Sequence, residues 1–138
     1  MAAVTRNTAR PVTPVGYEVN DKGQAKVAIE AGQLVIMTND TPTRSGHEVV
    51  WDLATTSTLY ADGICLQDVA AGGTIDVGLH GEMDGYADLT PGTPLYPSAS
   101  SAGELDTTAP EEFGTTPSSK ANFQIKAVRS TRIRFNFV

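Results

Sequence analysis

The sequence predicts an all-β fold with a small β-barrel or β-sandwich-like core, an extended N-terminal arm and a long surface loop rich in Ser, Thr, Pro and Gly. Two observations predict this fold class. The 13 Gly and 8 Pro residues are spread along the chain and leave few windows as long as a helix. Short segments with apolar residues at every second position recur between turn residues, which is typical of strands. A chain of 138 residues fits one domain with one hydrophobic core.

The first predicted strands lie in the N-terminal half. In residues 24–30 three apolar residues alternate with other side chains, which is the period of a half-buried strand: Ala25, Val27 and Ile29. Two short apolar runs, each following a glycine, indicate further strands at 34–37 and 49–51. The run at 34–37 is apolar throughout, so we expect that strand to be buried.

A hairpin is predicted in the middle of the chain. Residues 63–69 and 74–79 both alternate, and the Ala-Ala-Gly-Gly sequence at 70–73 provides a turn between them. The apolar members of the two strands are candidates for the inner faces of the core: Ile64, Leu66, Ile75, Val77 and Leu79.

The clearest predicted strand ends the chain. Within residues 132–137 every second residue is large and apolar, and the residues between them are polar or basic. The apolar face consists of Ile133, Phe135 and Phe137, and the polar face of Arg132, Arg134 and Asn136.

Two segments do not resemble core. Residues 1–15 have two prolines, several threonines and no apolar period, so we expect an extended arm that is disordered alone. The domain proper is then predicted to span residues 16–138. Residues 97–119 are rich in Ser, Thr, Pro and Gly and are predicted to form a long exposed loop, with a short hairpin around residues 103–106.

Charge is distributed unevenly along the chain, whose formal net charge is −6. Residues 45–119 contain twelve acidic residues and no Lys or Arg, whereas residues 1–17 and 120–138 contain bases and no acid. This pattern favours a protein whose acidic central part repels the same part of other copies and whose basic ends bind an acidic or mixed surface. The acidic balance argues against nucleic acid as a partner, and no apolar stretch is long enough to predict a membrane span.

Few residues suggest catalytic or metal chemistry. His80, Glu82 and Asp84 would share one face of a strand and offer metal ligands, but Gly81 and Gly85 favour a turn there. We therefore expect no metal site.

The single cysteine, Cys65, lies in a strand pattern between two apolar residues and has no basic partner nearby in the sequence, which favours a buried structural thiol. No phosphate loop, nucleophile elbow or dinucleotide fingerprint is present. We expect no catalytic residue and no cofactor.

Three interpretations apply to the basic residues near the C-terminus, which are Lys126, Arg129, Arg132 and Arg134. They are candidates for phosphate contacts. They also suit the outward face of an edge strand, where charge prevents pairing between sheets. Thirdly, they suit pairing with acidic residues of a neighbouring subunit or shell protein.

Residues 61–97 resemble the small head-decoration or cement proteins of tailed bacteriophages. The matching features are strand-and-turn patterns: Gly63-Ile64-Cys65-Leu66, Asp68-Val69-Ala70-Ala71-Gly72, Val77-Gly78-Leu79-His80-Gly81 and Leu89-Thr90-Pro91-Gly92-Thr93-Pro94-Leu95-Tyr96. The final strands at 125–128 and 132–135 are also similar in character. The resemblance extends over about half to three-quarters of the chain and does not include the first 24 residues or residues 98–119.

The resemblance implies a non-enzymatic virion protein. It would be made in the host cytoplasm and would bind the outer surface of the expanded capsid head through the major capsid protein. It would also form homo-oligomers; the family includes trimers and dimers and does not decide between them, and we expect a trimer rather than a dimer. Candidate interface residues under this hypothesis are Arg6, Arg10, Val12, Tyr17, Trp51, Tyr60, Tyr86, Arg132 and Arg134. For Trp51 alone, a plain core position is favoured over the interface role.

Two other functions remain open from the sequence. One is a β-barrel module that binds a small ligand or a glycan through residues 97–119. The other is a structural component of a tail or baseplate.

Overall fold

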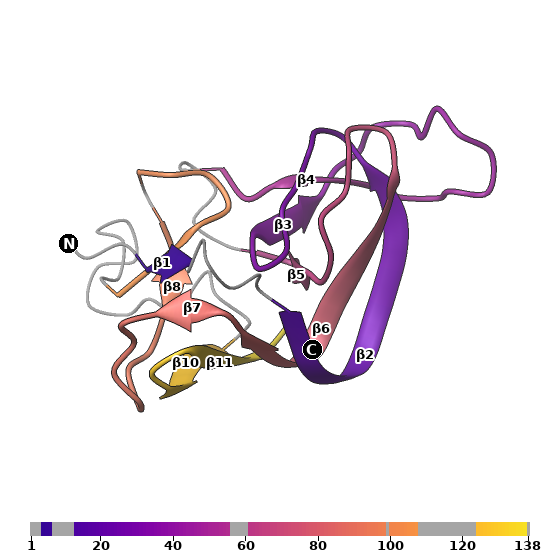
Figure 1. Cartoon of the computed structure of the whole chain (residues 1–138). Coiled ribbons are helices and arrows are strands. Elements are labelled where there is room, and N and C mark those ends of the chain that lie inside the picture. The colour runs from indigo at the N-terminus through magenta and orange to yellow at the C-terminus, as the bar shows by residue number, and fades with distance from the viewer. Residues whose placement is uncertain (1–3, 7–12, 56–60, 99, 108–123, 138) are drawn as a thin grey trace.

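The computed structural model describes residues 4–6, 13–55, 61–98, 100–107 and 124–137 (Figure 1). All regular secondary structure within these residues is β-strand, so the predicted all-β class is confirmed. The strands are β1 (Thr5–Arg6), β2 (Thr13–Ala25), β3 (Leu34–Met37), β4 (Val50–Leu53), β5 (Gly63–Cys65), β6 (Thr74–Asp84), β7 (Tyr86–Ala87), β8 (Tyr96–Pro97), β9 (Leu105–Asp106), β10 (Gln124–Arg129) and β11 (Arg132–Asn136).

Five of the strands close into a small barrel. They follow the order β6-β2-β4-β3-β5, and β5 pairs again with β6. All these pairings are antiparallel except that of β2 with β4, where Gln24 lies opposite Val50 and Ala25 opposite Trp51. Because the sheet closes on itself, the barrel has no free edge at the level where all five strands meet.

The long strand β6 joins the barrel to the strands outside it. One edge of β6 pairs with β2 along its whole length. The other edge pairs first with β5 at Val77 and Gly78, and then with β11 from His80 to Asp84. β10 pairs with β11, so β6, β11 and β10 form a sheet that extends away from the barrel (Figure 1).

The first of two cores fills the barrel. Its members come from the barrel strands and the turn after β2, and all are almost completely buried: Ala25, Ile29, Val35, Trp51, Cys65, Ile75 and Val77. A barrel of so few strands has an interior that side chains can fill, and here the indole of Trp51 is the largest of them.

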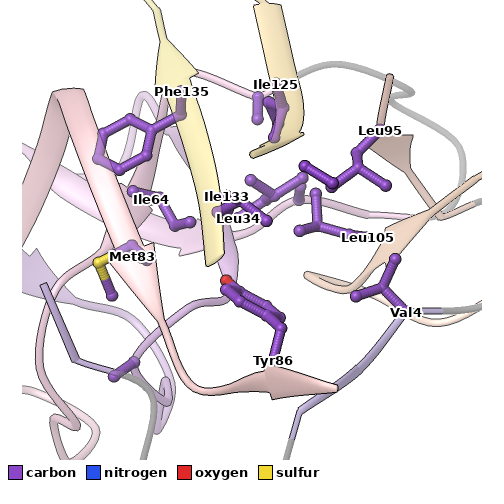
Figure 2. Close-up of a cluster of buried hydrophobic side chains, with 14 of the residues drawn as sticks. Val4, Leu34, Ile64, Met83, Tyr86, Leu95, Leu105, Ile125, Ile133 and Phe135 are labelled. Carbon is purple, nitrogen blue, oxygen red and sulfur yellow. The ribbon is translucent and has the colours of Figure 1, made fainter. Parts of the chain in front are cut away.

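The second core lies between the barrel wall and the outer strands (Figure 2). Alternation along β3 divides its residues between the cores: Val35 belongs to the barrel interior, and Leu34 and Ile36 to the second core. The outer strands contribute Ile125, Ala127, Ile133 and Phe135, and Tyr86 lies between these strands and Val4 in the close-up. The predicted apolar face of the last strand is therefore confirmed.

The prediction for residues 24–30 was wrong. The strand β2 ends at Ala25, Val27 is 37% exposed, and Ile29 makes only an isolated bridge with Val69. The strand instead begins at Thr13, before the predicted domain boundary at residue 16. Its pairing with β6 contains three register shifts, and these interrupt the alternation by which a strand is recognised.

Part of the predicted arm packs on the body of the chain. The N–H of Val4 donates to the carbonyl of Leu105 at 3.0 Å, and β1 pairs with β7. The Val4 side chain is only 9% exposed and belongs to the second core. Residues 7–12 of the arm lie outside the described residues.

The first part of the predicted loop at 97–119 also packs on the core. β8 and β9 form a small hairpin, which confirms the hairpin expected around residues 103–106. Ser98, Leu105 and Asp106 are buried, so these positions are not exposed as predicted. Residues 108–119 of the loop lie outside the described residues.

Candidate functional site

The outer face of the sheet formed by β6, β11 and β10 carries charge in two rows. In one row, Lys126 lies opposite Arg134, which lies opposite Glu82. In the other, Arg129 lies opposite Arg132, which lies opposite Asp84. Each row therefore has a base on β10, a base on β11 and an acid on β6. Beneath this face, the alternate residues of β10 and β11 are buried in the second core.

The acids of β6 hold the two arginines of β11 within the same chain. Arg134 donates from Nε to Glu82 Oε2 at 3.0 Å, and its Nη2 lies 2.9 Å from the same oxygen. Arg132 Nη2 lies 3.4 Å from Asp84 Oδ2, and its Nη1 lies 3.7 Å from Glu82 Oε1. Glu82 thus contacts both arginines, which makes this a small ion-pair network rather than an isolated pair.

The structure bears on three predictions. β6 continues as a strand through Glu82 to Asp84, so the turn expected after His80 was wrong. The edge strand expected for the basic residues is β10, which carries Lys126 and Arg129 at one end of the seven-stranded sheet, whereas β11 lies between β6 and β10. Arg132 and Arg134 have acidic partners within this chain, and their contact with another molecule stays a prediction.

The two predicted aromatic anchors described by the structure are core residues. Trp51 is 0% exposed inside the barrel, and Tyr86 is 1% exposed in the second core. The hydroxyl of Tyr86 donates to the backbone carbonyl of Gly32 at 2.9 Å, which gives the buried O–H its acceptor. Neither ring reaches the surface, so their prediction as interface anchors was wrong.

The side chains of the remaining predicted interface residues are not among those that the structure describes. The backbones of Arg6 and Tyr17 are in β1 and β2, but their side chains lie outside what the structure describes. Arg10, Val12 and Tyr60 lie outside the described residues altogether. The assignment of these five residues to an interface therefore stays a prediction.

Cys65 is a buried thiol of the barrel interior. Burial raises its pKa to about 11, the main cause being the loss of water around a charged thiolate. Its Sγ donates to the carbonyl of Gln67 at 3.0 Å. A thiol with this pKa is a poor nucleophile near neutral pH, which agrees with the structural interpretation.

The two histidines lie in different parts of the fold: His47 is in the segment between β3 and β4, and His80 is on β6. His47 Nε2 lies 3.2 Å from the hydroxyl of Thr74, at the start of β6. His80 lies opposite Asn136, toward the other end of the strand. Within the described ranges, no three His, Cys, Asp or Glu side chains come together in a group that would hold a metal ion.

A second charged row, which the sequence analysis did not single out, crosses the barrel wall at Ile36. Asp52 on β4 lies opposite Ile36, and Asp62, just before β5, flanks it on the other side. Asp62 is held there by two bonds: its N–H donates to Val35 O at 2.8 Å, and its carboxylate accepts from Met37 N–H at 2.9 Å. Only the strand register brings these two acids to one row.

Two exposed side chains, those of Met37 and Lys26, lie close to the acidic row, and Met37 points to the opposite face of β3 from Ile36. Met37 is 49% exposed, the most exposed of the large hydrophobic residues described. Lys26 is near enough for the Asp52 charge to raise its pKa slightly, but its Nζ lies 3.0 Å from Asp40, which is the main cause of that raised pKa. Lys26 therefore forms its ion pair with Asp40 rather than with the acidic row.

Comparison with known proteins does not place the chain in a family. No protein-family model matches the chain, and no curated protein matches it in sequence. Over the described residues, the structure has no helix long and apolar enough to cross a membrane.

Proposed function

We propose that this chain is a non-enzymatic virion protein that binds the outside of the expanded capsid of a tailed bacteriophage and cements neighbouring capsomers. Its partners would be the major capsid protein and further copies of itself, with a trimer favoured over a dimer. The resemblance of residues 61–97 to head-decoration proteins supports this proposal. In the structure these residues form β5, β6, β7 and the hairpin strand β8.

The observation that carries the proposal is the filled barrel. Val35, Trp51, Cys65, Ile75 and Val77 are each 0% exposed and occupy the barrel interior. A barrel whose interior is filled with side chains leaves only the outer surface of the molecule for binding. Here that surface carries separate acidic and basic areas. A rigid body with a charged exterior is well suited to attach to a larger assembly.

The physical role follows from where such a protein would sit. Packaged DNA presses outward on a capsid and loads the joints between capsomers. A protein that binds across a joint adds contact area on both sides and stabilises the bound form by mass action. Many copies on one shell, linked as oligomers, gain further from avidity.

Co-sedimentation tests the proposal. The purified chain is mixed with expanded heads and with unexpanded precursor shells of the virus that encodes it, and the bound fraction is measured against concentration. We expect saturable binding to expanded heads only, and the copy number at saturation then indicates threefold or twofold sites. Equal binding to both shell forms, or none to either, contradicts the cement role. Unlabelled chain in excess serves as the control for specific binding.

A further inference from the structure

Two basic side chains on β10 have no acidic partner among the residues that the structure describes. Lys126 and Arg129 face the two arginines of β11, which are themselves held by the carboxylates of β6. Both β10 side chains are exposed, and neither forms an ion pair with any residue that the structure describes. Because their partners on β11 are two residues apart, Lys126 and Arg129 lie about 7 Å apart along the strand. They form a local positive charge on a chain of net charge −6.

The acidic row on the barrel wall is the complement of this basic pair. Asp52 and Asp62 lie on either side of Ile36, two strand spacings or about 10 Å apart. Their carboxylates accept backbone hydrogen bonds from Leu53 and Met37, which fix their positions without neutralising their charge. The exposed side chain of Met37 lies on the opposite face of β3 from Ile36 and the two acids, so the acidic row offers charge rather than apolar surface.

We propose that Lys126 and Arg129 of one copy dock on Asp52 and Asp62 of a second copy of this chain. Flexible basic side chains span the difference between the two spacings, and opposite charges steer the copies into contact. The two surfaces belong to different parts of the molecule, since β10 lies outside the barrel and the acidic row crosses β4, β3 and β5 (Figure 1).

The charges also determine the geometry of the contact. Two basic pairs facing each other would repel, as would two acidic rows, so the same patch does not meet itself. The contact therefore joins unlike patches, either reciprocally in a two-fold dimer or head-to-tail in a ring such as a trimer or in a filament. This inference goes beyond binding to a capsid and does not depend on it, because both surfaces belong to the chain itself.

Sedimentation of the purified full-length chain tests the contact. We expect a weight-average mass above 14.5 kDa that rises with concentration in about 0.01 M salt, where charges act over ~30 Å, and falls toward the monomer in about 1 M salt, where they act over ~3 Å. The variant K126Q/R129Q should associate at least about tenfold more weakly, as should D52N/D62N, whose amides keep acceptors for the backbone bonds. The matched control K22Q/R44Q removes two exposed bases elsewhere and should associate like the parent chain.

Mixing the two defective variants tests whether the basic pair and the acidic row bind each other. K126Q/R129Q keeps the acidic row and D52N/D62N keeps the basic pair, so the mixture regains one good contact and should form a dimer that neither variant forms alone. A parent chain that stays monomeric at low salt overturns the proposal, as does association that both double variants retain. Neither result bears on binding of the chain to shells, which co-sedimentation tests separately.

Discussion

The backbone of Gly23 on β2 lies directly against the indole ring of Trp51 on β4. A Cβ at position 23 would lie 2.7 Å from Trp51 Cδ1 and 2.6 Å from the carbonyl oxygen of Val49. That carbonyl accepts the hydrogen bond from Gln24 N–H that joins β2 to β4, so it has little freedom to move. Across the described residues the indole N–H has no hydrogen-bond acceptor, so packing alone fixes the ring.

Gly23→Ala should therefore be strongly destabilising. The added methyl group meets backbone on one side and a fully buried ring on the other, and overpacking of this kind costs about 2–3 kcal/mol. Urea unfolding followed by Trp51 fluorescence measures the change. Gly46→Ala is the control: position 46 has open space but a φ of +88°, so only backbone strain of about 1 kcal/mol is expected. Equal losses in the two variants would show that the contact with Trp51 is unimportant.

Regular strands were the part of this fold that the sequence predicted well. In β11 the alternation of Ile133 and Phe135 with Arg132 and Arg134 is uninterrupted, and it assigned both faces correctly. In β2 the register shifts after Pro14 and around Val19 break the period, so the longest strand was interpreted partly as an arm. A local pattern records side-chain alternation, and a bulge changes the alternation without ending the strand.

The charged face shows what the sequence left undetermined. The polar face of β11 was predicted, but the partner of Arg134 is Glu82, 52 residues earlier in the chain. That pairing depends on how β11 registers on β6, which is a long-range property of the fold. The acidic row has the same origin, because Asp52 and Asp62 meet only through β3.

The ion pair between Glu82 and Arg134 should contribute measurably to stability. Glu82 contacts two arginines and its side chain is only 26% exposed, so a double-mutant cycle of Glu82→Gln and Arg134→Gln should give a coupling of about 1 kcal/mol at low salt. The comparison is Lys22 with Asp76, at 68% and 36% exposure, where we expect about 0.3 kcal/mol. A coupling for the first pair no larger than for the second would contradict a network role for Glu82.

Cys65 should make stability fall at alkaline pH. Its pKa is raised from 9.0 to about 11 in the folded chain, so above pH 9 the unfolded chain loses the thiol proton first. The unfolded state then binds fewer protons than the folded state, and stability decreases as pH rises. The stabilisation from the neutral thiol is complete below pH 9 and is lost through pH 11, a change of about 2–3 kcal/mol.

Unfolding by urea at several pH values between 8 and 11 measures this loss. Cys65→Ala serves as the reference, because it removes the thiol and keeps the other titrating groups. Its free energy of unfolding should be lower at pH 8 because of the cavity, and should decline less steeply toward pH 11. Parallel curves for the two chains would show that the thiol is not the cause.

Val4 should anchor the N-terminal segment to the second core. Its side chain is 9% exposed, and its N–H bonds to Leu105 O at 3.0 Å, next to the pairing of β1 with β7. Val4→Ala should cost about 1–2 kcal/mol through lost burial and a small cavity. The amide of Val4 should also exchange with solvent more slowly than an unbonded amide, since opening it requires the strand to detach.

Comparing this change with a truncation separates packing from capsid binding. Deleting residues 2–6 removes Val4 and β1 together, so it should destabilise at least as much as Val4→Ala. If the segment also contacts a capsid, the truncated chain should bind shells more weakly than Val4→Ala does at a temperature where both are folded. A truncation that leaves the melting temperature unchanged would mean that residues 4–6 do not pack on the body in solution, and the segment would then act as the free arm that its sequence suggests.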